Sequence, residues 1–259
     1  ISRGLDIALE RSAEVVILEL DTPGGSVEVM NNIIKDIRSS PVPVVVYVSP
    51  RNAMAASAGT IITLAGHLAA MAPETTIGAA SPVGSQGEDI GTTMESKVKE
   101  ILKAEARSLS RNRGEKAISL AEATIESARA VTSEEALDAG LIDFMAVDLN
   151  DLLRQLDGKT VVMDGSSVTL RTLDAEQVQV QNTFMEQLLR LLVNPNLVFI
   201  LLSIGVQAIF IELSSPGGWV AGFIGVVCLA LAVYGLGILP VNWFGLLFIL
   251  VAFVLFILE

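Results

Sequence analysis

The sequence predicts an α/β domain with a parallel sheet, followed by an all-α transmembrane segment. Short β-branched runs alternate with stretches of helical periodicity in the N-terminal part, and this order produces parallel strands joined by right-handed crossovers. The chain has 259 residues, is 51% hydrophobic and has a mean hydropathy of +0.58. No charged residue lies between Leu213 and Leu258, which is typical of helices embedded in lipid.

Charge divides the chain into two parts. All 17 Lys and Arg residues lie at or before Arg190, and of 29 acidic residues only Glu212 and Glu259 come later. Residues 1–190 therefore carry a net charge of −10, from 17 cationic and 27 acidic side chains. An acidic domain without a basic stripe argues against nucleic-acid binding. It also argues against charge-driven docking on anionic lipid.

Residues that bind metals or form disulfides are rare in this chain. Cys228 is the one cysteine and lies in the apolar tail, and His67 is the one histidine. A disulfide, a thiolate zinc site and a multi-histidine metal site are therefore excluded within one chain. The sequence implies no metal and no organic cofactor. Because the chain begins at Ile1 without Met, we expect it to be cut from a longer protein.

The first predicted elements follow a strand–helix–strand–helix order. Residues 13–20 are β-branched and end at a Pro-Gly-Gly turn, which predicts a buried strand. Residues 26–39 place apolar side chains at helical spacing and are followed by Pro41 and Pro43, which end the helix. The remaining elements of this series are a strand over 44–48, a helix over 57–66 and a strand over 68–71.

The rest of the domain is expected to be more helical. A Gly-, Ser- and Thr-rich surface loop over 82–93 leads into a helical region over 93–130 with a break near Gly114. The spacing of Thr132 and Glu135 predicts a capping box at the start of a short helix that Gly140 ends. The last predicted elements are a strand over 141–147, a helix over 149–156 and a hairpin of strands over 159–163 and 168–172.

The apolar tail is interpreted as a membrane region. An amphipathic segment over 184–192 is expected at the membrane interface. Three spans follow, each long enough to cross about 30 Å of hydrocarbon; they cover 197–213, 219–239 and 241–258. The first, which contains Glu212, could instead be a re-entrant or interfacial helix. The predicted organisation is a domain over 1–173, a connector with the interfacial helix over 174–194 and a transmembrane region over 195–259.

A serine between small residues is the candidate nucleophile. Ser57 lies in Ala55-Ala56-Ser57-Ala58-Gly59, at the start of a predicted helix, and its hydroxyl needs an adjacent base to react. The candidate donors for an oxyanion hole are the N–H groups of Gly24, Gly25 and Ala58. The sequence does not decide which glycine donates. The same pentapeptide also fits a tight helix start with a capping serine.

The base is expected to be a lysine. His67 would lie about 15 Å along the helix from Ser57, too far to take its proton, and is interpreted as a structural residue at the helix end. A lysine must be neutral to act as a base, so burial would have to lower its pKa. The candidates on the next helix are Lys97, Lys99 and Lys103.

Several motifs in this order resemble the NfeD family, the membrane-bound stomatin operon partner proteases related to the Clp proteolytic subunit and signal peptide peptidase A. They are Asp21-Thr22-Pro23-Gly24-Gly25, Ala56-Ser57-Ala58-Gly59-Thr60, Met71-Ala72-Pro73 and residues 77–83, and further matches occur in 134–143 and 211–242. The resemblance covers nearly the whole chain. It implies a Clp/crotonase-like fold, a Ser–Lys dyad, self-association and a stomatin-like partner.

The resemblance also bears on the choice of lysine. The family's catalytic lysine precedes a Gly-Arg-Asn motif. Matching that motif to Ser110-Arg111-Asn112 selects Lys103, whereas matching its glycine to Gly114 selects Arg107, which cannot act as a base. We favour Lys103, with Lys99 next; all of these cations could also be solvated charges on an exposed helix face.

The expected function is that of a membrane-anchored serine endopeptidase with a Ser57–Lys103 dyad. It would cleave apolar segments of stomatin-like (SPFH) membrane proteins. The resemblance implies a multi-pass protein of a prokaryotic plasma membrane with the protease domain on the outer face. One alternative is a catalytically inactive membrane scaffold for a stomatin-like partner. Another is acyl-CoA chemistry on a crotonase-like fold, which would leave the three membrane spans unexplained.

Overall fold

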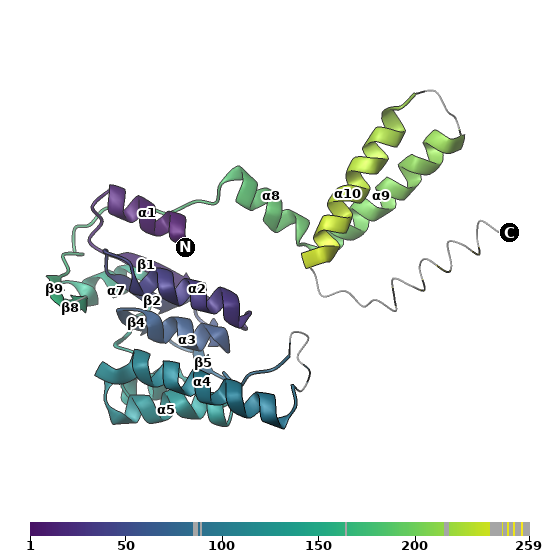
Figure 1. Ribbon diagram of the computed structural model, residues 1–259. Coiled ribbons are helices and arrows are strands. Elements are labelled where there is room, and N and C mark those ends of the chain that lie inside the picture. Colours follow the sequence, from purple (N-terminus) through teal and green to yellow (C-terminus); the bar gives the residue numbers. More distant parts are fainter. Residues whose placement is uncertain are drawn as a thin grey trace. The chain divides into compact units, whose positions relative to one another are not determined.

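The computed structural model describes residues 1–84, 88, 90–163, 165–214 and 218–238, and the single positions 245, 248, 251 and 255. The chain divides into two compact units, Ile1–Val178 and Gln179–Glu259, which Figure 1 colours from purple to yellow along the sequence. The expected fold class is confirmed. The first unit is an α/β domain with a parallel sheet, and the second contains two long apolar helices.

Four parallel strands form the main sheet, in the order β1-β2-β4-β7. They are β1 (Val16–Leu20), β2 (Val44–Val48), β4 (Leu68–Met71) and β7 (Phe144–Met145). All five residues of β2 are buried, as expected for a β-branched run covered on both faces of a parallel sheet. The predicted strands over 44–48 and 68–71 are confirmed, whereas the strand predicted over 141–147 is reduced to two residues.

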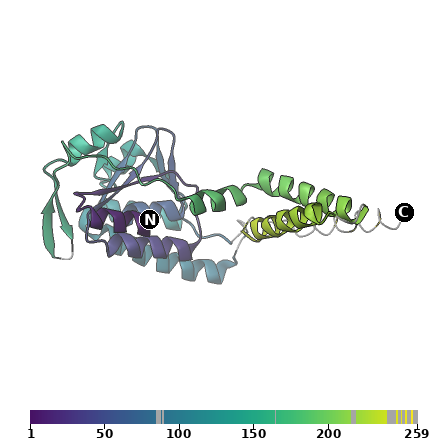
Figure 2. The ribbon, with the colours of Figure 1, turned by 90° about the horizontal axis from the view of Figure 1, so that it is seen from above.

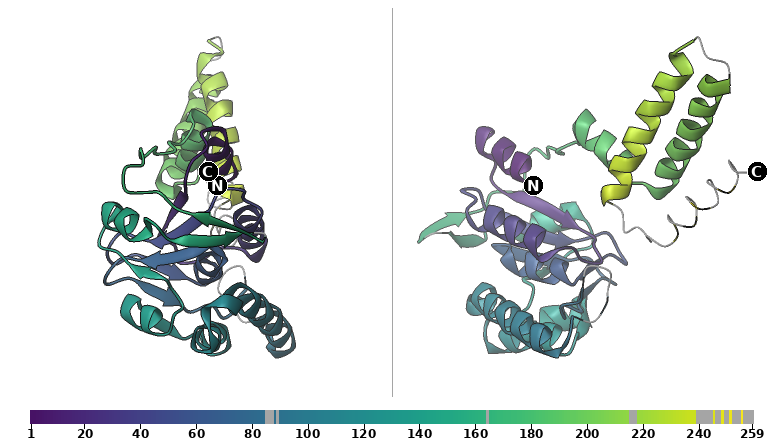
Figure 3. Two further views of the ribbon diagram at one scale, coloured as in Figure 1. Left: turned by 90° about the vertical axis from the view of Figure 1, so that its left-hand side faces the viewer. Right: turned by 45° about the vertical axis from the view of Figure 1, so that its right-hand side comes forward.

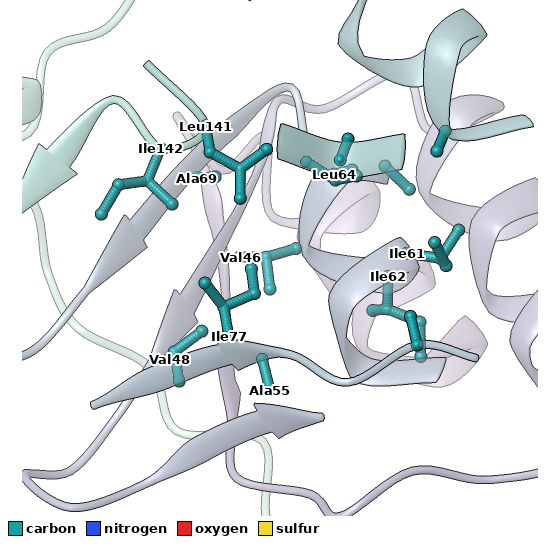
Figure 4. Close-up of a cluster of buried hydrophobic side chains, with 14 of the residues drawn as sticks. Val46, Val48, Ala55, Ile61, Ile62, Leu64, Ala69, Ile77, Leu141 and Ile142 are labelled. Atoms are coloured by element: carbon teal, nitrogen blue, oxygen red, sulfur yellow. The ribbon is translucent and has the colours of Figure 1, made fainter. Parts of the chain in front are cut away.

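Helix α2 (Val27–Arg38) follows β1, and helix α3 (Ala58–Ala65) follows the short strand β3 (Met54–Ala56). The hydroxyl of Ser26 caps α2 by accepting a hydrogen bond from Val29 N, and the helix buries Met30, Ile34 and Ile37. Every residue of α3 is buried. Figure 4 shows side chains of this core. Those from β2 are Val46 and Val48, those from α3 are Ile61, Ile62 and Leu64, and Leu141 and Ile142 come from a later segment before β7.

A second sheet of three short strands was not predicted from the sequence. It contains β3 (Met54–Ala56), β5 (Thr76–Gly78) and β6 (Ala130–Thr132), with β3 parallel and β6 antiparallel to β5. Three residues are too few to produce a readable alternation of apolar and polar side chains. Helix α1 (Ser2–Glu10) was also missed.

The predicted helical region is a pair of helices with the expected break. Helix α4 (Thr92–Ser110) is followed by the short 3₁₀ helix η1 (Arg111–Arg113) and by α5 (Glu115–Glu126). Gly114 has a φ of +92° at the break, a conformation that glycine adopts without cost. Figures 1 and 3 show α4 and α5 running side by side, and α4 buries Leu102 and Ala106 in the core.

The last elements of the first unit match the sequence closely. Helix α6 (Ser133–Asp138) begins with the predicted capping box of Thr132 and Glu135, and α7 (Leu149–Leu156) has the predicted bounds. Strands β8 (Thr160–Met163) and β9 (Ser166–Thr169) form the expected hairpin, visible in Figures 2 and 3 as a projecting ribbon.

The second unit contains α8 (Phe184–Leu192), α9 (Pro195–Ser214) and α10 (Val220–Ile238). A capping box of Thr183 and Glu186 starts α8. Both α9 and, over Val220–Gly237, α10 are long and apolar enough to cross a membrane, each with a mean hydropathy of 2.2. The third predicted span, 241–258, lies outside the described residues except for single positions.

Helices α9 and α10 pack closely as an antiparallel pair (Figure 2). Two glycines face each other: a Cβ on Gly205 would lie 3.2 Å from the Gly225 carbonyl oxygen, and one on Gly225 would lie 3.0 Å from that of Gly205. Small residues allow such a backbone approach between apolar helices. The Glu212 carboxylate accepts hydrogen bonds from Trp219 N (3.0 Å) and Gly222 N (3.1 Å) at the start of α10.

Candidate functional site

Ser57 occupies a strained turn between β3 and α3. Its backbone has φ +54° and ψ −120°, a conformation that L-residues other than glycine rarely adopt and that costs about 1–3 kcal/mol. The Ser57 N–H donates to the Gly78 carbonyl oxygen at 2.9 Å. Its hydroxyl makes no hydrogen bond to any described residue. A strained strand-to-helix turn of this kind presents a serine hydroxyl to a reactant.

The Pro-Gly-Gly turn lies directly against Ser57. A Cβ built on Gly24 would lie 2.8 Å from the Ser57 Cβ and 3.1 Å from its Oγ. The turn is held by a short parallel bridge to β3, in which Thr22 N donates to Met54 O (2.7 Å) and Ala56 N donates to Thr22 O (3.0 Å). Two motifs about 30 residues apart in sequence are thereby brought into contact.

The two glycines of the turn have different roles in the geometry. The Gly24 N–H donates to the hydroxyl of Thr22 at 3.1 Å and is therefore already paired. The role of Gly24 is to leave room for Ser57, because it has no side chain. The Gly25 N–H has no acceptor among the described residues. The Ala58 N–H lies at the first position of α3, where no intrahelical acceptor exists. The structure therefore leaves Gly25 and Ala58 as the available donors of the predicted set.

Lys103 is held as a cation. Its Nζ lies 2.5 Å from Glu100 Oε1 and 2.8 Å from Glu126 Oε2. Hydrogen bonds to these two carboxylates raise the pKa of Lys103 above its ordinary value. The expectation that burial lowers this pKa is therefore wrong for Lys103, because Glu100 on the same helix and Glu126 on α5 stabilise the charged form.

The other lysines of α4 differ in their partners. Lys99 Nζ lies 2.7 Å from Glu95 Oε1. Lys97 is exposed and makes no ion pair with the residues that the structure describes. At 100° per residue, Lys99 lies within the buried stripe that contains Leu102 and Ala106, and Lys103 lies beside it. Lys97 lies on the opposite, exposed flank of the helix.

That second flank of α4 is partly apolar. Met94, Lys97 and Ile101 are spaced i, i+3 and i+7 and share one helix face. Met94 is 56% exposed and Ile101 is 67% exposed. Lys97 therefore lies between two uncovered apolar side chains, on the side of α4 that faces away from the ion pairs to α5.

The remaining candidates have structural roles. His67 accepts a hydrogen bond at Nδ1 from Val44 N (3.1 Å), in agreement with its interpretation as a structural residue. The Ser81 hydroxyl, a second possible nucleophile, donates to Ile125 O. Ser85, a third, lies outside the described residues. Within the described part of the chain, no group of three or more His, Cys, Asp or Glu side chains could hold a metal ion.

Two residues that organise the turn were not singled out from the sequence. Thr22 fixes Gly24, and the buried Thr60 contacts Ala55 in the middle of β3 and Gly78 at the end of β5. Both lie in motifs that resembled the NfeD family. Only the short strands of the second sheet reveal what they bind, and those strands gave no sequence signal.

Two family models match the chain: NfeD1b, N-terminal domain, over residues 1–164, and the NfeD integral membrane domain over residues 196–259. The chain belongs to the NfeD family. The N-terminal model alone covers more than half of the 259 residues. Together with the two apolar helices, the second match identifies a membrane protein.

A curated relative and two solved structures are similar to this chain. The membrane-bound protease PH1510 of Pyrococcus horikoshii is 38% identical over 261 residues, which cover 99% of this chain and 59% of that protein. The chain thus spans about three fifths of that relative's length.

Both solved structures are of 1510-N, a membrane-bound stomatin-specific protease. A lysine-to-alanine variant in complex with a substrate peptide has 37% identity and a TM-score of 0.66, with 72% of this chain and 86% of that chain covered. A serine-to-alanine variant has 37% identity and a TM-score of 0.64, with 70% and 88% covered.

Proposed function

We propose that this chain is a membrane-anchored serine endopeptidase in which Ser57 is the nucleophile. The observation that carries the proposal is the strained Ser57 turn in contact with Gly24. It presents a hydroxyl with no described hydrogen-bond partner beside two available N–H donors, those of Gly25 and Ala58. The relatives named as proteases support the same reaction class.

The reaction would follow the general scheme of acyl transfer. Ser57 Oγ attacks the peptide carbonyl carbon while its proton passes to a neutral lysine amine. The N–H groups of Gly25 and Ala58 stabilise the oxyanion. The lysine then returns the proton to the leaving amine as the C–N bond breaks. Water hydrolyses the acyl-enzyme, giving up a proton to the same lysine and restoring the Ser57 hydroxyl.

For the base we propose Lys97, in place of the Lys103 expected from the sequence. Carboxylates pair with both Lys99 and Lys103, and those around Lys103 stabilise its protonated form, which opposes a role as a base. No described carboxylate pairs with Lys97. A substrate lying across Met94 and Ile101 would cover this amine and remove it from water, which lowers a lysine pKa.

Sequence spacing in the related structures also supports Lys97. Their names place the substituted serine and lysine 41 positions apart, at 97 and 138 of that sequence. In this chain Lys97 follows Ser57 by 40 positions, Lys99 by 42 and Lys103 by 46. Aligning the substituted lysine of the related structures with Lys97 or Lys99 requires a gap of one residue, and aligning it with Lys103 requires a gap of five. This spacing disfavours Lys103, and the ion pair of Lys99 then favours Lys97 over Lys99.

We further propose apolar segments of stomatin-like membrane proteins as substrates. The related structures are named as stomatin-specific, and the apolar flank around Lys97 suits an apolar peptide. Attachment to membrane helices would keep the site near such substrates. Self-association and placement of the domain on the outer face of the membrane complete the proposal.

The test uses the full chain in detergent and a fluorophosphonate probe that reacts with activated serines. We expect labelling of the wild type, its loss in Ser57→Ala, and a loss of at least about a hundredfold in labelling rate in Lys97→Ala. Lys99→Ala and Lys103→Ala should retain labelling. A loss confined to Lys99→Ala or Lys103→Ala would transfer the role of base to that lysine.

The alternative function is a catalytically inactive scaffold for a stomatin-like partner. The ion pairs that hold Lys103 as a cation favour this scaffold function, since they oppose the role of base that the sequence first suggested for Lys103. Folded wild-type protein that neither reacts with the probe nor cleaves a stomatin-like substrate would establish this alternative.

A further inference from the structure

Thr60 lies one helical turn after Ser57 and is fully buried. Its Oγ1 lies 2.9 Å from Ala55 O, 2.9 Å from Gly78 O and 3.0 Å from Gly78 N. Ala55 belongs to β3 and Gly78 ends β5, so one hydroxyl joins two strands of the second sheet beneath the Ser57 turn. Inside a protein, each of these polar groups would be costly to leave unpaired.

The same carbonyl that contacts Thr60 also fixes Ser57. Gly78 O accepts from Ser57 N at 2.9 Å, and Ser57 O accepts from Thr60 N at 3.0 Å. Ser57, Thr60 and Gly78 thus form a closed set of hydrogen bonds. Gly78 packs closely against the backbone before β6, since a Cβ at this position would lie 2.2 Å from Arg129 O.

We propose that Thr60 is a positioning residue that holds Ser57 in its positive-φ conformation and so aims the Ser57 hydroxyl at the substrate. A strained backbone conformation persists only where several surrounding contacts hold it in place. The hydrogen bonds of Thr60 are some of those contacts. The inference deepens the proposed function, on which its catalytic part rests. Thr60 does not touch the substrate in this account.

The test compares substitutions at two buried threonines of α3. Thr60→Val removes the hydroxyl and keeps the shape, and Thr60→Ser keeps the hydroxyl. Thr63→Val is the matched control, since Thr63 is equally buried and its hydroxyl donates to Gly59 O, its one partner among the described residues. We expect fluorophosphonate labelling of Ser57 to slow by at least about tenfold in Thr60→Val. Labelling should stay within about threefold of wild type in Thr60→Ser and Thr63→Val.

A second measurement separates aiming from general stability. In peptide hydrolysis, Thr60→Val should lower kcat with little change in KM, because the interaction it removes acts on the nucleophile. Wild-type kinetics in folded Thr60→Val would overturn the proposal. Equal losses in Thr60→Val and Thr63→Val would overturn it as well.

A double-mutant cycle tests the strain without any enzyme activity. Glycine adopts positive φ freely, so Ser57→Gly removes the strain that Thr60 is proposed to counter. Thr60→Val should therefore lower the Tm more in the Ser57→Gly background than in the wild type, because in the wild type Ser57 can relax from its strained conformation and offset part of the loss. Equal shifts would overturn the proposal, even if the wild type proves unreactive and the proposed function fails. If Thr60→Val does not fold alone, the same cycle is measured with Thr60→Cys, which keeps the size of the side chain and weakens its hydrogen bonds.

Discussion

The α-carbon of Gly24 lies against the side chain of Ser57, so closely that a methyl group on Gly24 would come within 2.8 Å of the Ser57 Cβ. Gly24 also has a φ of +138°, which strains any other residue. The two residues are joined through the Thr22 bridge to β3. The glycine motif and the serine motif are therefore parts of one site.

Gly24→Ala should disable Ser57. The added methyl group must displace either the turn or the serine, and we expect at least about a tenfold slower reaction with a fluorophosphonate probe together with a lower Tm. Gly4→Ala on α1 is the matched control, because nothing lies within 4 Å of a Cβ there and Gly4 is outside the site. Normal labelling of folded Gly24→Ala would contradict the contact.

The Lys103–Glu126 pair should stabilise the first unit in a pH-dependent way. The hydrogen bond from Lys103 lowers the pKa of Glu126. A carboxylate with a lowered pKa contributes stability above its unfolded pKa, about 4.3, and loses it as the pH falls through the folded value. Glu126→Gln should therefore lower the urea midpoint slightly at neutral pH. The difference from wild type should disappear in acid; a difference that grows on acidification would refute the assignment.

Tyr47 should make stability fall at high pH. Its buried hydroxyl donates to Ala146 O at 2.9 Å, and burial raises the pKa of Tyr47 to about 12. An unfolded tyrosine ionises near pH 10, so its stabilising contribution is complete below that pH and is lost as the pH rises towards 12. In Tyr47→Phe the free energy of unfolding should fall by about 1 kcal/mol at neutral pH, because the hydrogen bond to Ala146 O is lost.

The same variant should show a shallower loss of stability between these two pH values than the wild type. Chemical unfolding across alkaline pH measures both effects. If the stability of Tyr47→Phe and of the wild type falls in parallel with rising pH, ionisation of Tyr47 is not the cause of the alkaline loss of stability.

Gly225→Val should weaken the packing of α9 against α10. A side chain there would meet Ile209 at 2.8 Å and the Gly205 carbonyl oxygen at 3.0 Å. We expect the detergent-solubilised protein to lose helical circular dichroism at a lower temperature. Gly237→Val is the control, because a Cβ at that position meets no atom within 4 Å. Equal thermal stability of the two variants would show that the glycine contact is unimportant.

Elements with strong local signals were predictable from the sequence. The bounds of β2 and α7 were predicted correctly because each has a clear local pattern. The apolar, β-branched run of β2 is enough to identify a buried strand, and the capped, periodic segment of α7 is enough to identify a helix. Strands β3, β5 and β6 were missed because three-residue strands depend on pairing partners far away in the sequence. Propensity contains no information about such pairing.

The same division holds for the site. The motifs containing Gly24 and Ser57 were recognised, and the structure brings them together. The state of Lys103 could be predicted only in part. Glu100, three residues earlier on the same helix, is a readable partner, but Glu126 comes from the neighbouring helix and shows itself only in the fold. A lysine's protonation depends on both kinds of neighbouring charge.

The carboxylate of Glu212 joins the end of one apolar helix to the first amides of the next. The first amides of a helix have no acceptor within that helix, and this carboxylate supplies an acceptor for two of them. These hydrogen bonds tie the two apolar helices to each other at one end, in addition to the contact between their glycines.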